Sequence, residues 1–84
     1  MTEQTLLSLA SIVTAGLTVT VGSIAPALAE GRAVVAALDA IARQPDAAAT
    51  TTRTLFVGMA MVESTAIYCL VVALVLLFAN PLIP

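Results

Sequence analysis

Two long apolar segments separated by a short polar connection make up nearly the whole chain. From Gln4 to Ala29 no residue is charged, and from Thr54 to Ala79 the only charged residue is Glu63. At about 1.5 Å per residue, either segment is longer as a helix than the ~30 Å hydrocarbon core of a bilayer. The pattern predicts two membrane-spanning helices, the first over about residues 4–43 and the second over about residues 51–79.

The connection reads RQPDAAATTTR, residues 43–53, and contains a proline, several polar residues and two of the three basic residues of the chain. This composition predicts a loop over about residues 44–50. Residues 1–84 are therefore expected to form a single helical hairpin, an all-α membrane protein. Because two helices cannot enclose a core of their own, we expect copies of the hairpin to associate.

The composition excludes a soluble globular domain, because 61% of the residues are hydrophobic and only 10% are charged. The net charge of −2 gives no basis for a nucleic-acid partner. The three basic residues, Arg32, Arg43 and Arg53, lie at or near the loop. Cytoplasmic loops of membrane proteins are rich in such residues, so the loop is predicted to be cytoplasmic and both termini outside.

Only two carboxylates, Glu30 and Glu63, lie far from the chain ends and from the loop. Glu30 lies about 16 residues before a turn near Pro45, and Glu63 about 17 residues after it. In two antiparallel helices both carboxyl groups reach the same depth, roughly 20–25 Å from the loop. Because an ionised carboxylate in hydrocarbon is costly, such a residue indicates a function. The alternative is that Arg32 neutralises Glu30, but a spacing of two residues directs the two side chains to different sides of a helix.

Two acids at one site disfavour each other's ionisation, so at least one of them is expected to carry a proton near neutral pH, and the two titrate as a coupled pair. Ser64, Thr65 and Tyr68 bring further oxygen atoms close to Glu63. Such a group of oxygens can bind a proton or a hard cation such as Na⁺. Alternatively, the Ser and Thr hydroxyls only donate to the backbone of their own helix.

Several motifs give the chain a resemblance to the c subunit of rotary F-type ATP synthases over essentially its full length. They are ARQP at residues 42–45, IAPALAEG at residues 24–31, ESTAIY at residues 63–68 and FANP at residues 78–81. The paired glutamates together with ESTAIY are similar to the N-type ATPase branch of this family.

The resemblance implies a homo-oligomeric ring in a bacterial inner membrane, rotating against a stator a subunit while ions bind to and leave Glu63. It implies that Arg43, Gln44 and Pro45 contact the central stalk on the cytoplasmic side. Membrane lipid is a further expected partner, and no cofactor is expected. Glu30 stands where Na⁺-binding members of the family have a glutamine, so Glu63 and Glu30 are the expected metal ligands if the ion is Na⁺.

The chain contains no phosphate-binding loop and no histidine, so no catalytic residue is predicted and the chain is expected to be a non-catalytic, ion-translocating subunit. We favour H⁺ as the transported ion because any carboxyl group can take a proton. The alternatives are a Na⁺-specific rotor ring and a membrane assembly hairpin that transports nothing. A small multidrug transporter fits less well, because the chain offers only Phe56, Tyr68 and Phe78 to contact lipophilic cations.

Overall fold

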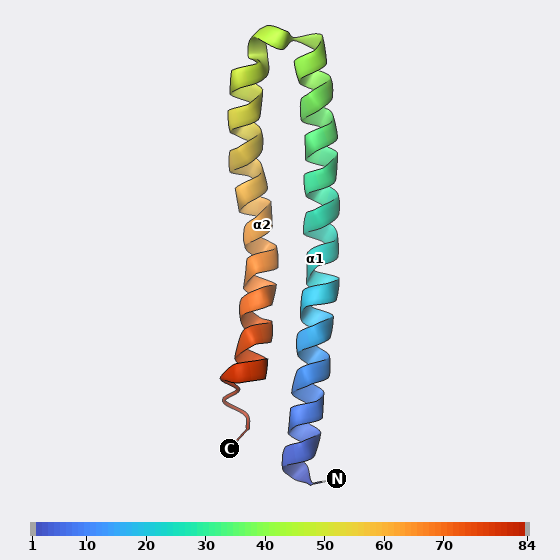
Figure 1. Ribbon diagram of the computed structural model, residues 1–84, viewed down its shortest axis with the longest axis vertical. Helices are drawn as coiled ribbons and strands as arrows, with labels where there is room; N and C mark the ends of the chain where they lie inside the picture. The colour runs from blue at the N-terminus through green and yellow to red at the C-terminus, as the bar shows by residue number, and fades with distance from the viewer. Residues whose placement is uncertain (1, 84) are drawn as a thin grey trace.

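The computed structural model describes residues 2–83, which form two antiparallel helices joined by a tight turn (Figure 1). Helix α1 spans Glu3–Arg43, a turn of 3₁₀ helix (η1) spans Pro45–Ala47, and helix α2 spans Ala48–Phe78. The predicted all-α hairpin is confirmed. Both helices are long and apolar enough to cross a membrane. The hairpin is 64 Å long, so it extends beyond the ~40–45 Å of a bilayer with its headgroups.

Helix α1 is capped by hydrogen bonds at both ends. The Thr2 hydroxyl accepts a hydrogen bond from the Thr5 N–H at 3.1 Å, which satisfies one of the free donors of the first turn. At the other end the Gln44 N–H donates to the Ala40 carbonyl at 2.8 Å. Pro26 lies inside α1 and is buried. It interrupts the helical hydrogen bonding one turn before Glu30 without ending the helix.

Helix α2 begins earlier than the sequence pattern suggests. It starts at Ala48, whereas we expected a loop over about 44–50 and a helix from about residue 51. The reason is local: Ala48 and Ala49 have the highest helix propensity of any residue type, and the turn at Pro45–Ala47 leads directly into them. Helix α2 ends at Phe78, before the Asn80-Pro81 pair.

The two helices keep one register along their whole shared length. Three contacts establish it: Ser11 with Asn80, Gly22 with Cys69, and Glu30 with Glu63. The midpoint of each pair falls within the turn Pro45–Ala47, as it must for two helices of equal rise. A residue's level on one helix is therefore fixed by its distance from the turn.

The core is only a narrow strip between the helices, which we call the seam. Within residues 2–83 its buried apolar side chains are Pro26 and three alanines, Ala15, Ala37 and Ala73. Large apolar side chains instead point outward, and even Phe78 is 82% exposed. The hairpin therefore presents most of its apolar surface to lipid or to other copies of the chain.

Candidate functional site

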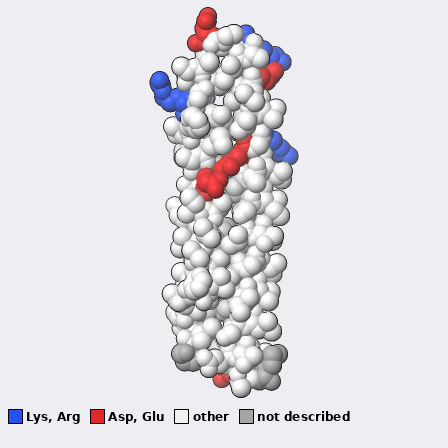
Figure 2. Space-filling view, viewed as in Figure 1, with Lys and Arg blue, Asp and Glu red and all other residues white. Residues whose placement is uncertain are grey.

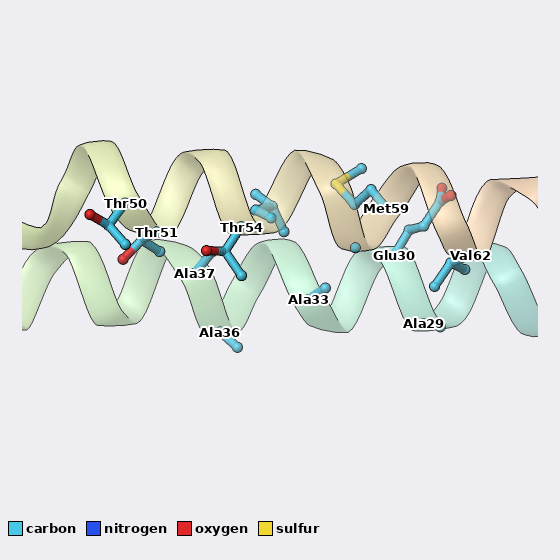
Figure 3. A pocket seen from close by; sticks show the side chains of 12 residues that line it. Ala29, Glu30, Ala33, Ala36, Ala37, Thr50, Thr51, Thr54, Met59 and Val62 are labelled. Carbon is cyan, nitrogen blue, oxygen red and sulfur yellow. The ribbon is translucent and has the colours of Figure 1, made fainter.

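Glu30 lies on the side of α1 that faces α2. Its side chain is half-buried and crosses the seam, so that its carboxyl group lies next to α2 near Val62 (Figure 3). Small neighbours make this possible, because Ala29 and Ala33 leave room beside the extended side chain. The carboxyl group of an α1 residue is in this way delivered to the surface of the second helix.

Glu63 meets Glu30 from α2. The two carboxyl groups are close enough to interact through a hydrogen bond and through their charges. Glu63 itself is exposed on the flank of α2, beside the seam residue Val62. Figure 2 shows an acidic patch on the wall of the hairpin below the loop end, with a basic side chain at the right edge of the view near the level of its upper end. The expected meeting of two carboxylates at one level is therefore present within one hairpin.

No basic side chain neutralises this pair within residues 2–83. The ion pair found there joins Arg43 and Asp39, with 3.2 Å between Nε and Oδ2, at the loop end of α1. Arg32 is exposed and makes no ion pair with Glu30. Two carboxylates in contact cannot both be ionised in an apolar setting without a large electrostatic cost. The pair therefore requires a proton, or a cation from outside the hairpin.

The other predicted ligands are not gathered around Glu63 in the hairpin. The Ser64 hydroxyl donates to the Ala60 carbonyl of its own helix at 2.9 Å, as Ser in membrane helices often does. Thr65 is exposed, and Tyr68 is 71% exposed. The part of Ser64, Thr65 and Tyr68 in ion binding stays a prediction. It would require a neighbouring copy of the chain to cover the exposed side of α2.

A groove on the loop side of Glu30 was not anticipated from the sequence. It has a volume of about 540 Å³ and is lined mainly by alanine and threonine, with Glu30 at one end (Figure 3). The signal for it was the small residues on the facing sides of the two helices, Ala33 and Ala37 on α1 and Thr54 and Gly58 on α2. The helices touch but leave space where neither side chain is large enough to fill it.

The residues expected to contact a central stalk lie at the tip of the hairpin. Arg43, Gln44 and Pro45 are all exposed and, with Asp46 and Ala47, surround a shallow hollow at the turn. Arg43 keeps a side-chain exposure of 77% although it is paired with Asp39. The tip is therefore a polar surface, available to a partner outside the membrane.

Comparisons with known proteins agree with these features. The family described as the ATP synthase C subunit matches residues 13–76. The chain is 64% identical over 81 residues to the second ATP synthase c subunit of Cereibacter sphaeroides (strain ATCC 17029 / ATH 2.4.9), covering 96% of each chain. It is 54% identical over 74 residues to the ATP synthase c subunit of Prochlorococcus marinus (strain AS9601), covering 88% of this chain and 91% of that one.

A third relative extends the likeness to another genus. The ATP synthase c subunit of Synechococcus sp. (strain JA-2-3B'a(2-13)) is 49% identical over 76 residues, covering 90% of this chain and 94% of that one. The family match includes most of both helices, the turn and both glutamates. The chain thus belongs to the family of ATP synthase c subunits, whose members are non-catalytic, ring-forming components of the membrane rotor of that complex.

Proposed function

We propose that this chain forms a rotor ring in a bacterial inner membrane and that Glu63, assisted by Glu30, carries protons across it. The observation that supports this most is the close approach of the two carboxyl groups across the seam, with no basic partner within residues 2–83. Two carboxylates without a basic partner form a neutral site only when they have bound protons or another cation. It is therefore built to bind a cation and to release it where water or a counter-charge is available.

The two glutamates have different roles in this proposal. Glu63 is exposed on the flank of α2, within reach of a stator, whereas Glu30 is half-buried on the seam. Glu63 therefore exchanges the proton with the aqueous paths at the stator. Glu30 stays beside it, takes part in the hydrogen bond that closes the loaded site, and keeps that site free of net charge when both acids are protonated.

We favour the proton over Na⁺ because of the number of ligands that each requires. A hard cation needs several oxygen ligands, whereas a proton needs a single acceptor. Within the hairpin the carboxyl groups of Glu30 and Glu63 meet, but Ser64 donates to its own helix and Tyr68 is exposed. A Na⁺-specific ring is the second candidate, supported by the oxygen atoms of Ser64, Thr65 and Tyr68 that a neighbouring copy could complete.

The orientation and partners follow from the distribution of charge. All three arginines lie in the half of the hairpin nearer the loop, so the loop is cytoplasmic and both termini are outside. The exposed tip at Arg43, Gln44 and Pro45 contacts the central stalk. The stator a subunit meets the flank of α2 that carries Glu63, and lipid covers the remaining outward apolar surface.

The test is to replace Glu63 with glutamine in the assembled ATP synthase reconstituted into vesicles, and to measure ATP-driven acidification with a pH-sensitive dye. Glutamine keeps the size and hydrogen-bonding capacity of the side chain but cannot release a proton. Glu63→Gln is expected to abolish acidification while the ring still assembles. Glu3→Gln, the same chemical change at the exposed start of α1, is the matched control and is expected to pump normally.

The same variants decide against the competing function. If the hairpin only anchors or assembles other proteins, Glu30 and Glu63 merely share hydrogen bonds, and glutamine replaces them without loss. Normal acidification by an assembled Glu63→Gln ring would therefore overturn the proposed function and favour the assembly hairpin.

A further inference from the structure

Phe56 is a large apolar side chain that lies outside the seam and is 66% exposed. It follows Leu55, which is half-buried beside α1. At about 100° per residue, the Phe56 side chain therefore points to one flank of α2. Glu63 has the same position relative to the seam residue Val62. Phe56 and Glu63 thus lie on the same flank, about two turns apart.

The groove beside Glu30 lies on the opposite flank of the hairpin. Thr54, which lines the groove, comes directly before Leu55 and so points about 100° to the other side of it. Thr50 continues this flank one turn nearer the loop, and Figure 3 shows both threonines towards the loop end of the groove with Glu30 at its far end. One flank of the hairpin therefore carries a bulky ring, and the other carries a hollow.

Phe56 lies at the level of this groove. Ala36 lines the groove from α1, and the midpoint between Ala36 and Phe56 falls within the turn Pro45–Ala47, so the two residues are level. Copies in a ring are related by rotation about one axis, so one flank of a copy can meet the opposite flank of the next copy at the same height. The Phe56 ring of one copy then faces the groove of its neighbour.

Small residues on both flanks of α1 favour contact through the flanks. Ala29 and Ala33 lie on the flank with the groove. Ala27 and Gly31 lie towards the other, with open space around Gly31. Such residues let neighbouring α1 helices approach closely, which places α1 on the inner circle of the ring and α2 on the outer circle. Glu63 then lies at the outer edge of the contact between copies, where a stator can reach it.

We infer that Phe56 fills the groove of the neighbouring copy and seals the approach to the carboxyl pair from the loop side. The groove, of about 540 Å³, extends from Thr50 near the loop to Glu30, and threonine hydroxyls line its loop end. Left open, it would admit water to Glu30, and the pair would exchange protons away from the stator. A phenyl ring at the level of Ala36 closes the groove before it reaches Glu30. The sealing role rests on the proposed function, whereas the contact itself does not.

The lining of the groove suits a phenyl ring. Alanine side chains leave the space that the ring occupies, and Met59 brings a thioether, which makes favourable contacts with aromatic rings. Helices in a membrane associate through close packing rather than through the hydrophobic effect. A bulky ring in a hollow of small residues supplies such packing between copies.

The contact is tested by replacing Phe56 with the photoreactive analogue p-benzoylphenylalanine in the ring assembled in its membrane. On illumination the analogue bonds to C–H groups within its reach. The expected product is a covalent dimer of the chain in which mass spectrometry places the new bond in the groove of the second copy, at Met59 or within residues 33–37. The same analogue at Phe78, which is 82% exposed, is the matched control and is expected to bond to lipid.

Two results of this experiment would overturn the inference. One is bonding of the analogue at position 56 only to lipid or to the stator. The other is bonding to the groove from both positions, because the reagent rather than the position would then select the groove.

The seal is tested with a thiol placed deeper in the groove than Phe56. Ala33→Cys supplies it, in a ring whose native thiol is removed by Cys69→Ala. The rate of its reaction with a charged, water-soluble maleimide is measured. Phe56→Ala is expected to raise this rate by about tenfold or more, because it removes most of the packing of the ring. Phe56→Leu keeps a bulky side chain and is expected to raise the rate much less, and equal rates with Phe, Leu and Ala at position 56 would overturn the seal.

The photochemical experiment decides the inference even if Phe56→Ala does not assemble. Neither readout depends on ion transport. A ring that pumps protons but gives no bond in the groove overturns this inference and leaves the proposed function intact. A ring that gives the bond but does not pump keeps the contact and overturns the function.

Discussion

The half of the hairpin near the termini and the half near the loop are packed in different ways, although both use small residues. Near the termini, Ala15 and Ala73 are each only 2% exposed, and Gly22 lies directly against Cys69. Near the loop, the helices leave a groove of about 540 Å³ beside Glu30. Small residues bring helices together only where the facing side chain fills the space, as Cys69 does opposite Gly22.

The polar contacts between the helices also differ between the two halves of the hairpin. Near the termini, the Asn80 amide donates to the Ser11 hydroxyl at 2.6 Å and also lies 3.3 Å from the Leu76 carbonyl. Near the loop, the polar groups that approach each other across the seam are the carboxyl groups of Glu30 and Glu63. The half near the termini therefore holds the helices together through a hydrogen bond and close packing, and the half near the loop carries the two carboxyl groups to which we assign ion binding.

The largest effect on stability is expected at Gly22. A Cβ atom at this position would lie 3.0 Å from the Cys69 Cβ and closer still to the Cys69 sulfur, which forces the helices apart. Gly22→Ala is therefore expected to destabilise the ring by about 1–3 kcal/mol, the usual cost of overpacking. The measurement is the temperature at which the purified ring dissociates in detergent.

The matched control for Gly22 is Gly58, which lines the groove and where an added Cβ atom would have no neighbour within 4 Å. Gly58→Ala is expected to leave the dissociation temperature unchanged or to raise it, because alanine favours the helix by up to ~1 kcal/mol. If both glycine substitutions lower the dissociation temperature equally, the helices are packed equally tightly at Gly22 and at Gly58, which contradicts the difference between the two halves.

A smaller effect is expected from the hydrogen bond between Ser11 and Asn80. Removing one such bond costs about 0.5–1.5 kcal/mol. Ser11→Ala is expected to lower the dissociation temperature slightly. Asn80→Ala is expected to lower it more, because Asn80 also accepts from the Leu82 N–H at 2.8 Å. The double variant should match Asn80→Ala alone, since the two residues share one bond.

Thr18 provides the control for this bond. Its hydroxyl donates to the Thr14 carbonyl of the same helix at 2.7 Å, so Thr18→Ala removes a hydroxyl without breaking a contact between the helices. This variant is expected to be as stable as the wild type. Additive losses in the Ser11 and Asn80 variants would show that the bond does not join the two helices in the ring.

The sequence was sufficient to predict the hairpin and the pairing of the two glutamates. The apolar segments and the proline-containing connection defined the helices, and the equal spacing of Glu30 and Glu63 from the turn placed them at one level. Hydrophobic periodicity and helical rise are enough to place both features. Both are properties of the chain that do not depend on how the helices are rotated about their own axes.

The features that were missed do depend on that rotation. The contact of Gly22 with Cys69, the bond from Asn80 to Ser11 and the groove beside Glu30 each require a particular face of α1 to meet a particular face of α2. Because both helices are apolar on all sides, their hydrophobic pattern does not select one face. Cys69, for example, fills the space opposite one particular glycine, Gly22.

The central claim is that the Glu30–Glu63 pair binds the transported proton, and chemical labelling of Glu63 tests it most directly. A hydrophobic carbodiimide reacts with a carboxyl group only when it is protonated. Its rate of reaction with Glu63 can be followed in the purified ring as the pH is raised, with NaCl or with KCl at equal ionic strength. If the pair binds a proton, labelling slows as the pH rises and is the same in both salts. Labelling that NaCl slows and KCl does not would contradict it, because the site would then bind Na⁺.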